Sequence, residues 1–159
     1  MSVSLHATAV ALGEVGVLIQ GPSGAGKSTL ALALIDEARA QGRYGALVGD
    51  DRVIVEAAHG RLILAGAPGF EGLIESRGEG IVRRPHEPAT VAALVVDLFP
   101  KGSAPPRFPD PTAEHIDILG VTLPRLLLDL APGVVFGARM TLRRLMITPT
   151  ECPAIGNFA

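Results

Sequence analysis

The stretch GPSGAGKS, residues 21–28, limits what this chain can fold into more than any other feature. Its glycines allow backbone conformations that other residues avoid, so successive N–H groups can point toward one anion. The stretch follows a short apolar run, EVGVLIQ (14–20), and leads into KSTLALALIDEARAQG (27–42), which is rich in helix formers and ends at a glycine. A glycine-rich loop between a strand and a helix is typical of a site for nucleotide phosphates.

Each part of this loop has an expected role. Lys27 would reach the β- and γ-phosphates of a nucleotide, and the hydroxyl of Ser28 would bind Mg²⁺. The chain has only two lysines, Lys27 and Lys101, and one of them stands where the motif requires it. The alternative is a glycine turn that precedes a helix and binds nothing. We predict an ATP site made by Gly21, Pro22, Ser23, Gly24, Ala25, Gly26, Lys27, Ser28 and Thr29.

The remaining pattern predicts an α/β fold with a good share of antiparallel strand. YGALVGDD (44–51) is predicted to be the next strand, so strand, helix and strand would form a βαβ unit with a parallel pair. RVIVEA and RLILA flank a His-Gly turn and predict a hairpin. VAALVVDLF (91–99) predicts another buried strand, whereas TLPRLLLDL (122–130) fits a strand or a helix. PKGSAPPRFPDP (100–111) is predicted to be a long irregular loop.

Composition narrows the function classes. A length of 159 residues with 48% hydrophobic residues predicts one folded domain, which we expect over 1–147, with a loosely ordered tail over 148–159. The net charge of −2, with no basic run, argues against a nucleic-acid partner. No apolar stretch is long enough for a membrane span, and the first residues lack a basic secretory signal. The single cysteine, Cys152, excludes an internal disulfide framework and fits a reducing cytoplasm.

Charged residues follow the loop at two places. Asp50 and Asp51 come at the end of a predicted strand, the edge at which open α/β sheets place their sites. One carboxylate could hold Mg²⁺ or take a proton from an attacking hydroxyl, and a solvated turn is the alternative. In IESRGEGIV (74–82), Glu75 and Arg77 bracket either a metal and phosphate site or a purely structural loop.

In combination these motifs are more specific. His6, GPSGAGKS, DDRV (50–53) and ESRGEGI (75–81) occur in the order found in one bacterial family. The chain resembles the catalytic domain of HPr kinase/phosphorylase, and most closely the short form of alphaproteobacteria, which lacks a separate N-terminal domain. The resemblance implies a mixed sheet with a phosphate loop, of the type shared with phosphoenolpyruvate carboxykinase.

The resemblance also implies a reaction and its residues. ATP, with Mg²⁺ shared by Ser28 and Glu75, would phosphorylate a serine of the phosphocarrier protein HPr. Asp51 would be the base that deprotonates this serine, and Asp50 would assist it or bind metal. The further catalytic residues implied by the family pattern are His6, Lys27, Arg77 and Arg107.

In the reverse reaction of the family, inorganic phosphate attacks phosphoserine and gives pyrophosphate, with Asp51 donating the proton. The late loop tied to this reaction is represented here only by LAPGVVFGAR (130–139), and the C-terminal helices that hold HPr are shortened. Thr29 stands where long members commonly have Glu. The kinase reaction therefore carries over more directly than the phosphorylase reaction. The family implies a homo-oligomer, for which the hexamer of long members is the model.

Three other functions share the phosphate loop. A small-molecule kinase would need an arginine-rich lid, which the late sequence lacks. A module that only senses nucleotide would not need Asp51 and Glu75. A GTPase switch is disfavoured because the chain has no Asn-Lys-x-Asp motif.

Overall fold

The computed structural model describes residues 1–108 and 110–146. Most elements of the described chain are strands, and its two α-helices come after the third strand and at the end. In chain order the elements are β1 (Ser2–Leu5), β2 (Thr8–Leu12), β3 (Val15–Gln20), α1 (Lys27–Ala40), β4 (Gly45–Gly49), β5 (Val53–Ala58), β6 (Arg61–Gly66), β7 (Leu73–Ser76), β8 (Gly80–Arg83), β9 (Ala89–Leu98), the 3₁₀ turn η1 (Pro111–Glu114), β10 (His115–Ile118), β11 (Val121–Leu128) and α2 (Val134–Met146).

One curled sheet of nine strands forms the body of the domain, in the order β1-β5-β6-β9-β3-β2-β4, with β11 and then β10 attached beside β9. The long strand β9 explains this branching. Its first residues pair with β6 in antiparallel fashion, and its last residues pair with β11 in parallel. Its other edge pairs in parallel with β3. The carboxyl ends of β3, β9 and β11 therefore meet at one edge of the sheet.

The fold class predicted from the sequence is confirmed, but the predicted parallel pair within the βαβ unit is wrong. β3 and β4 are not neighbours, because β2 lies between them and pairs in antiparallel fashion with both. β2 joins β3 through only two residues, so this hairpin occupies the edge of β3 before the chain returns as β4. All five residues of β2 are buried, which is why it lacks the alternation that marks a strand with one exposed face.

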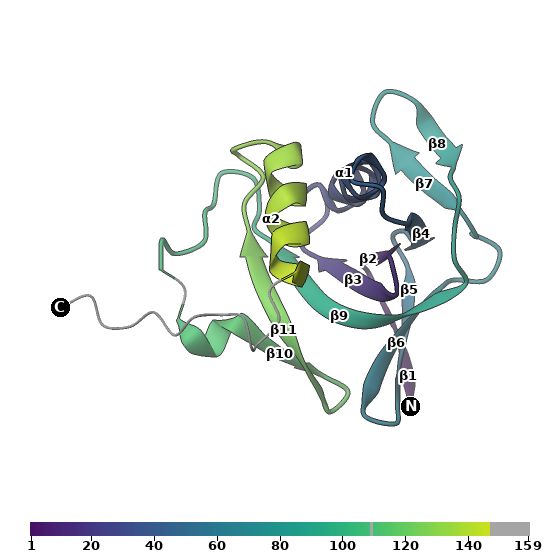
Figure 1. The fold of residues 1–159 in the computed structure, drawn as a ribbon, viewed down its shortest axis with the longest axis horizontal. Coiled ribbons are helices and arrows are strands. Elements are labelled where there is room, and N and C mark those ends of the chain that lie inside the picture. Colours follow the sequence, from purple (N-terminus) through teal and green to yellow (C-terminus); the bar gives the residue numbers. More distant parts are fainter. Residues whose placement is uncertain (109, 147–159) are drawn as a thin grey trace.

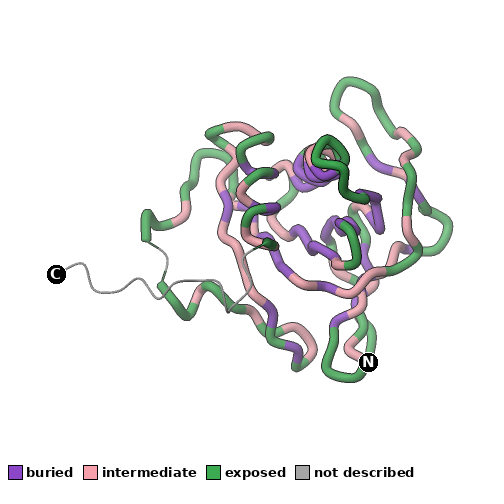
Figure 2. Tube along the Cα trace, in the orientation of Figure 1, coloured by how far each residue is buried: buried purple, intermediate pink, exposed green. Residues whose placement is uncertain are grey.

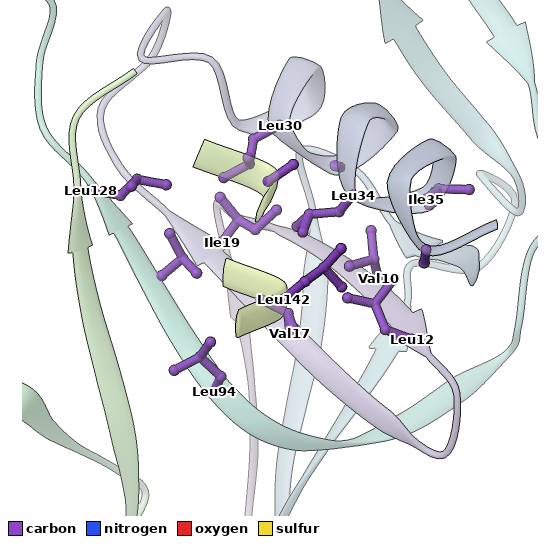
Figure 3. Packing of buried hydrophobic residues seen from close by; sticks show 14 of the residues in the cluster. Val10, Leu12, Val17, Ile19, Leu30, Leu34, Ile35, Leu94, Leu128 and Leu142 are labelled. Atoms are coloured by element: carbon purple, nitrogen blue, oxygen red, sulfur yellow. The ribbon is translucent and has the colours of Figure 1, made fainter. Parts of the chain in front are cut away.

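Both helices cover the same face of the sheet, and the β7–β8 hairpin stands on the other side of α1 from α2 (Figure 1). α1 turns Leu30, Leu34 and Ala38 inward at the four-residue spacing of a helix face. They pack with Val17 and Ile19 of β3 and with Leu142 of α2 (Figure 3). Each fully buried leucine of this kind contributes roughly 1.5–3 kcal/mol.

The opposite face of the sheet has its own core. Leu18 points away from Val17 and Ile19 and packs with Val55, Leu64 and Val95. Burial is therefore greatest along the central strands and the inner side of α1, whereas the β7–β8 tip and the loop after β9 are exposed (Figure 2). A sheet covered on both sides holds the ends of β3 and β9 in fixed positions.

The structure decides the secondary structure of two segments near the end of the described chain, 122–130 and 130–139. The ambiguous segment 122–130 is mostly strand β11, which extends the parallel part of the sheet beyond β9. Residues 130–139, expected as a loop, include the start of α2 at Val134. The predicted tail, Cys152 and the boundary at 147 lie outside the described residues. Neither helix in the described ranges has the length and hydropathy needed to cross a bilayer.

Candidate active site

The phosphate loop connects β3 to α1 at the sheet edge where three parallel strands end. Lys27 is 6% exposed, and its Nζ donates to the carbonyl oxygens of Gly21 at 2.9 Å and Pro22 at 3.2 Å. These bonds fold the ammonium group back under the loop. The loop therefore combines a fixed positive charge with the positive end of the α1 dipole.

Gly26 closes the loop in a conformation that only glycine adopts readily, with φ of 105°. Space is also short there, because a Cβ at this position would lie 2.8 Å from Leu130 Cδ1. The same leucine lies against the first turn of α2, where a Cβ on Gly137 would come within 2.7 Å of Leu130 Cδ2. Leu130 thus packs between the phosphate loop and α2.

The carboxylate of Asp50 is a hydrogen-bond acceptor for three different elements. Its Oδ1 accepts from Ser28 Oγ at 2.7 Å and from Thr8 Oγ1 at 2.8 Å, and its Oδ2 accepts from Glu75 N at 3.3 Å. Thr8 is fully buried at the start of β2. Asp50 therefore fixes the first turn of α1 against β2 and β7.

The neighbouring Asp51 faces another direction. The N–H of Arg52 donates to Asp50 O at 2.7 Å, and Asp51 between them has φ of 62°. These are the features of a γ-turn with positive φ, a rare and strained turn. The turn leaves the Asp51 side chain 76% exposed. His6 Nδ1 lies 3.1 Å from Asp51 O and 3.8 Å from Asp51 Oδ1.

A cavity of about 510 Å³ lies in front of these groups. The phosphate loop forms one wall, His6 and Asp51 form another, and the β7–β8 hairpin forms the third with Glu75 and Arg77. The segment 74–82, expected to be a glycine loop, thus belongs mostly to the strands β7 and β8, and its tip at 77–79 is closed by a bond from Ser76 Oγ to Glu79 Oε2 at 2.6 Å. The tip is both a structural turn and a wall of the cavity.

The residues present fit a magnesium ion bound with a nucleotide. Mg²⁺ in such sites usually takes one or two carboxylates, and phosphates and water complete its octahedron. Ser28 and Asp50 are in contact, and Glu75 lines the same cavity. Within residues 1–108 and 110–146 no three His, Cys, Asp or Glu side chains cluster as a metal site. The protein's oxygen donors therefore suit a metal ion whose remaining ligands are substrate phosphates and water.

The structure separates some predicted residues from this group. Arg107 lines neither this cavity nor its neighbour, and its guanidinium lies 5.8 Å from the ring centre of Phe108 on the exposed loop after β9. Pro22 contributes its carbonyl to Lys27 and is otherwise exposed. Ala25 borders a second cavity on the far side of the loop, and Thr29 lines both cavities.

One residue next to the site was not predicted from the sequence, and one carboxylate near the phosphate loop does not belong to the site. Thr8 is the missed partner of Asp50, and the available signal was a lone hydroxyl in the apolar run TAVAL. Asp97 is the last residue but one of β9 and pairs with Gln20, next to the phosphate loop. However, Asp97 shares the sheet face of Val95, away from α1, and is hydrogen-bonded to Arg125 of β11. It therefore belongs to the opposite face.

Comparisons with known proteins agree with this geometry. A family model described as "HPr Serine kinase C-terminal domain" matches residues 1–86, more than half of the chain. An HPr kinase/phosphorylase of Limosilactobacillus reuteri is 42% identical over 80 residues, which cover 50% of this chain and 23% of that protein. One from Geobacillus thermodenitrificans is 32% identical over 150 residues, covering 82% of this chain and 43% of that protein. The chain thus spans less than half the length of these relatives.

A solved structure extends the likeness to the fold. The HPr(Ser) kinase/phosphatase from Coxiella burnetii matches with a TM-score of 0.68 at 25% sequence identity. The match covers 89% of this chain and 95% of that one.

Proposed function

Since the chain belongs to the family of HPr serine kinase C-terminal domains, we propose that it transfers the γ-phosphoryl group of ATP to a serine of the phosphocarrier protein HPr. The observation that carries this proposal is that two adjacent carboxylates have different surroundings. Asp50 is held by Ser28 and Thr8, whereas Asp51 is exposed to a cavity that the phosphate loop also lines.

In the forward step the serine Oγ attacks the γ-phosphorus. The bond from Oγ to phosphorus forms, the bond from the γ-phosphorus to the β-γ bridging oxygen breaks, and ADP leaves. The serine proton passes to the Asp51 carboxylate, which is the role of a general base. His6 lies against this carboxylate and positions it. Lys27 and the loop amides hold the β- and γ-phosphates as charge develops on them.

Mg²⁺ would be held by Ser28 with Asp50 or Glu75, and when bound it neutralises charge on the transferring group. Asp50 is thereby assigned to the metal side of the site and Asp51 to the proton. Arg77 lines the cavity from the hairpin tip and would contact the phosphates. Arg107 would reach the site only if its loop moved.

The reverse reaction follows from the same groups. An oxygen of inorganic phosphate attacks the phosphorus of phosphoserine, the serine oxygen leaves with the proton of Asp51, and pyrophosphate forms. One carboxylate serves both directions by microscopic reversibility.

We further expect a homo-oligomer, with the hexamer as the form to test by sedimentation, and a cytoplasmic location.

The direct test is transfer of label from γ-labelled ATP with Mg²⁺ to HPr and to HPr with its acceptor serine replaced by alanine. Label on HPr that disappears with the alanine form supports the proposal, and pyrophosphate release on adding phosphate extends it to the reverse reaction. ATP binding without any label on HPr would overturn it. Small-molecule acceptors would then be tried, since a kinase for these shares the phosphate loop, and a nucleotide sensor would label none.

A further inference from the structure

A second cavity of about 350 Å³ borders the phosphate loop on the side away from Asp50 and Asp51. Three segments form its walls: the start of α1, the loop that follows β9, and the loop between β11 and α2. It shares Gly26, Thr29 and Arg77 with the first cavity. The two hollows therefore meet at the phosphate loop and at the hairpin tip.

The strand order explains why they lie on opposite sides. β3 carries the phosphate loop, with β2 and β4 on one side of it and β9 and β11 on the other. β4 leads to Asp50 and Asp51, whereas β9 and β11 lead to the walls of the second cavity. A ligand that has its terminal phosphate at Asp51 and follows the phosphate loop across the sheet edge would extend its other end toward β9 and β11.

The second cavity differs from the first in chemistry. Phe99, Leu130 and Val134 give it apolar walls, and its polar side chains are those of Thr29, Arg77, Lys101 and Asp129. Its volume is within the range of about 300–1,000 Å³ that is usual for small-molecule sites. Flat heteroaromatic rings bind in such places, with their faces against apolar groups and their polar edges toward a few side chains.

The walls are held by main-chain hydrogen bonds. Phe99 N donates to Leu128 O at 3.0 Å, which ties the end of β9 to the end of β11. Ala131 N donates to Asp129 Oδ1 at 2.9 Å, and Gly133 N donates to Leu130 O at 2.9 Å. The loop is thus ordered by its own contacts, which lowers the entropic cost of binding a ligand against it.

We propose that this second cavity binds the base and ribose of the donor nucleotide, with Arg77 beside the phosphates that link them to the transfer site. This inference rests on the proposed function, because it requires the phosphate loop to hold a nucleotide. Asp129 supplies an acceptor for an exocyclic amine of the base, a group that inorganic polyphosphate lacks.

The test compares the dissociation constants of ATP and of inorganic tripolyphosphate, both with Mg²⁺, for the full chain and two variants. Ala131→Trp fills the cavity from an exposed position on its wall. Ala40→Trp is the control, since Ala40 is also exposed but lies at the end of α1 outside both cavities. The full chain should bind ATP at least about tenfold more tightly than tripolyphosphate, a difference of about 1.4 kcal/mol. Ala131→Trp should remove that difference and leave tripolyphosphate binding unchanged.

Equal binding of the two ligands by the full chain, or ATP binding unaffected by Ala131→Trp, would overturn the nucleoside subsite and leave the phosphate site intact. Failure to bind either ligand would instead overturn the proposed function. Photolabelling of the full chain with 8-azido-ATP decides the case in which the tryptophan disturbs the phosphate loop. Label within 99–102 or 129–134, suppressed by excess ATP, supports the subsite. Label confined to the β7–β8 hairpin overturns it and leaves the second cavity to the acceptor protein.

Discussion

Ser28 Oγ donates to Asp50 Oδ1 at 2.7 Å, and this bond joins the first turn of α1 to the end of β4. Thr8 shares the same carboxylate oxygen, so Asp50 has two hydroxyl donors before any ligand arrives. The bond matters for the proposed reaction, in which the two consecutive aspartates have different roles. Asp50 would organise the loop and the metal side, and Asp51, which lines the cavity, would face the acceptor.

Asp51→Asn should keep nucleotide binding and lose phosphoryl transfer by about 10²–10⁴-fold, because a general base is removed. Asparagine is the right replacement because it tolerates the positive φ of Asp51, whereas alanine would add roughly 1–2 kcal/mol of strain. Transfer of label to HPr and the ATP dissociation constant are the two measurements. Asp36→Asn, on the exposed side of α1, is the matched control. Full-rate transfer by the Asp51 variant would move the base role to Asp50.

Thr8→Val should lower the free energy of unfolding by about 1–3 kcal/mol, because the valine cannot donate to a buried carboxylate. It should also weaken Mg²⁺-dependent ATP binding, since Asp50 loses a bond that orients it. The fully buried Thr141, whose hydroxyl donates to Gly137 O within α2, offers a matched Thr141→Val control. This control should lose stability but not the Mg²⁺ dependence of ATP binding. An unchanged Mg²⁺ dependence in Thr8→Val would show that Ser28 and the Glu75 N–H suffice to place Asp50.

Lys27→Met should raise the dissociation constant of ATP by about 10- to 100-fold, because a charge-assisted bond to phosphate is lost. Methionine keeps the buried aliphatic stem but not the bonds to Gly21 O and Pro22 O, so the free energy of unfolding should fall by about 1–3 kcal/mol. Arg61→Met, at an exposed position in β6, controls for the loss of one positive charge. Isothermal titration with ATP and with tripolyphosphate should report the same loss for both ligands. Undiminished affinity would contradict the loop assignment.

Arg77→Ala should slow both transfer to HPr and the release of pyrophosphate in the reverse direction. The residue is exposed at the hairpin tip and lines both cavities, so its loss should leave thermal unfolding nearly unchanged. Arg77→Lys, which keeps the charge but not the planar fork, should recover only part of the rate. Arg61→Ala serves as the control. A fall in stability with normal rates would return the hairpin tip to a purely structural role.

The elements predicted correctly are those whose signal is local. The run from Lys27 to Ala40 has helix formers and an apolar face, and VAALVVDLF is apolar except for Asp97, so neither needs its neighbours to be recognised. β2 was missed because all five of its residues are buried. Strand adjacency was wrong for a related reason. The neighbours of β3 in the sheet depend on segments outside the local pattern. β2 pairs with the edge of β3 at which β4 was expected.

The site shows the same division between local and distant information. That Asp50 and Asp51 lie near the phosphate loop followed from the end of a strand. Their different surroundings, one carboxylate hydrogen-bonded and the other exposed, go with one positive φ at Asp51, which the sequence does not encode in any visible pattern. α2 was missed because Gly137 and two valines are poor helix formers. Its contacts with α1, through Ala138 and Leu142, outweigh that propensity.

The side chain of Leu130 limits the size of the residues at two distant positions, 26 and 137. It fills the space that a side chain on Gly26 or Gly137 would need. Gly26 also has a positive φ, which disfavours any other residue at that position. Of the three positions, only 130 and 137 can therefore vary in size together, with one side chain larger when the other is smaller. Among related sequences, a larger residue at 137 should therefore occur together with a smaller one at 130. Such correlated substitution would reveal the packing between the phosphate loop and α2 without any structure.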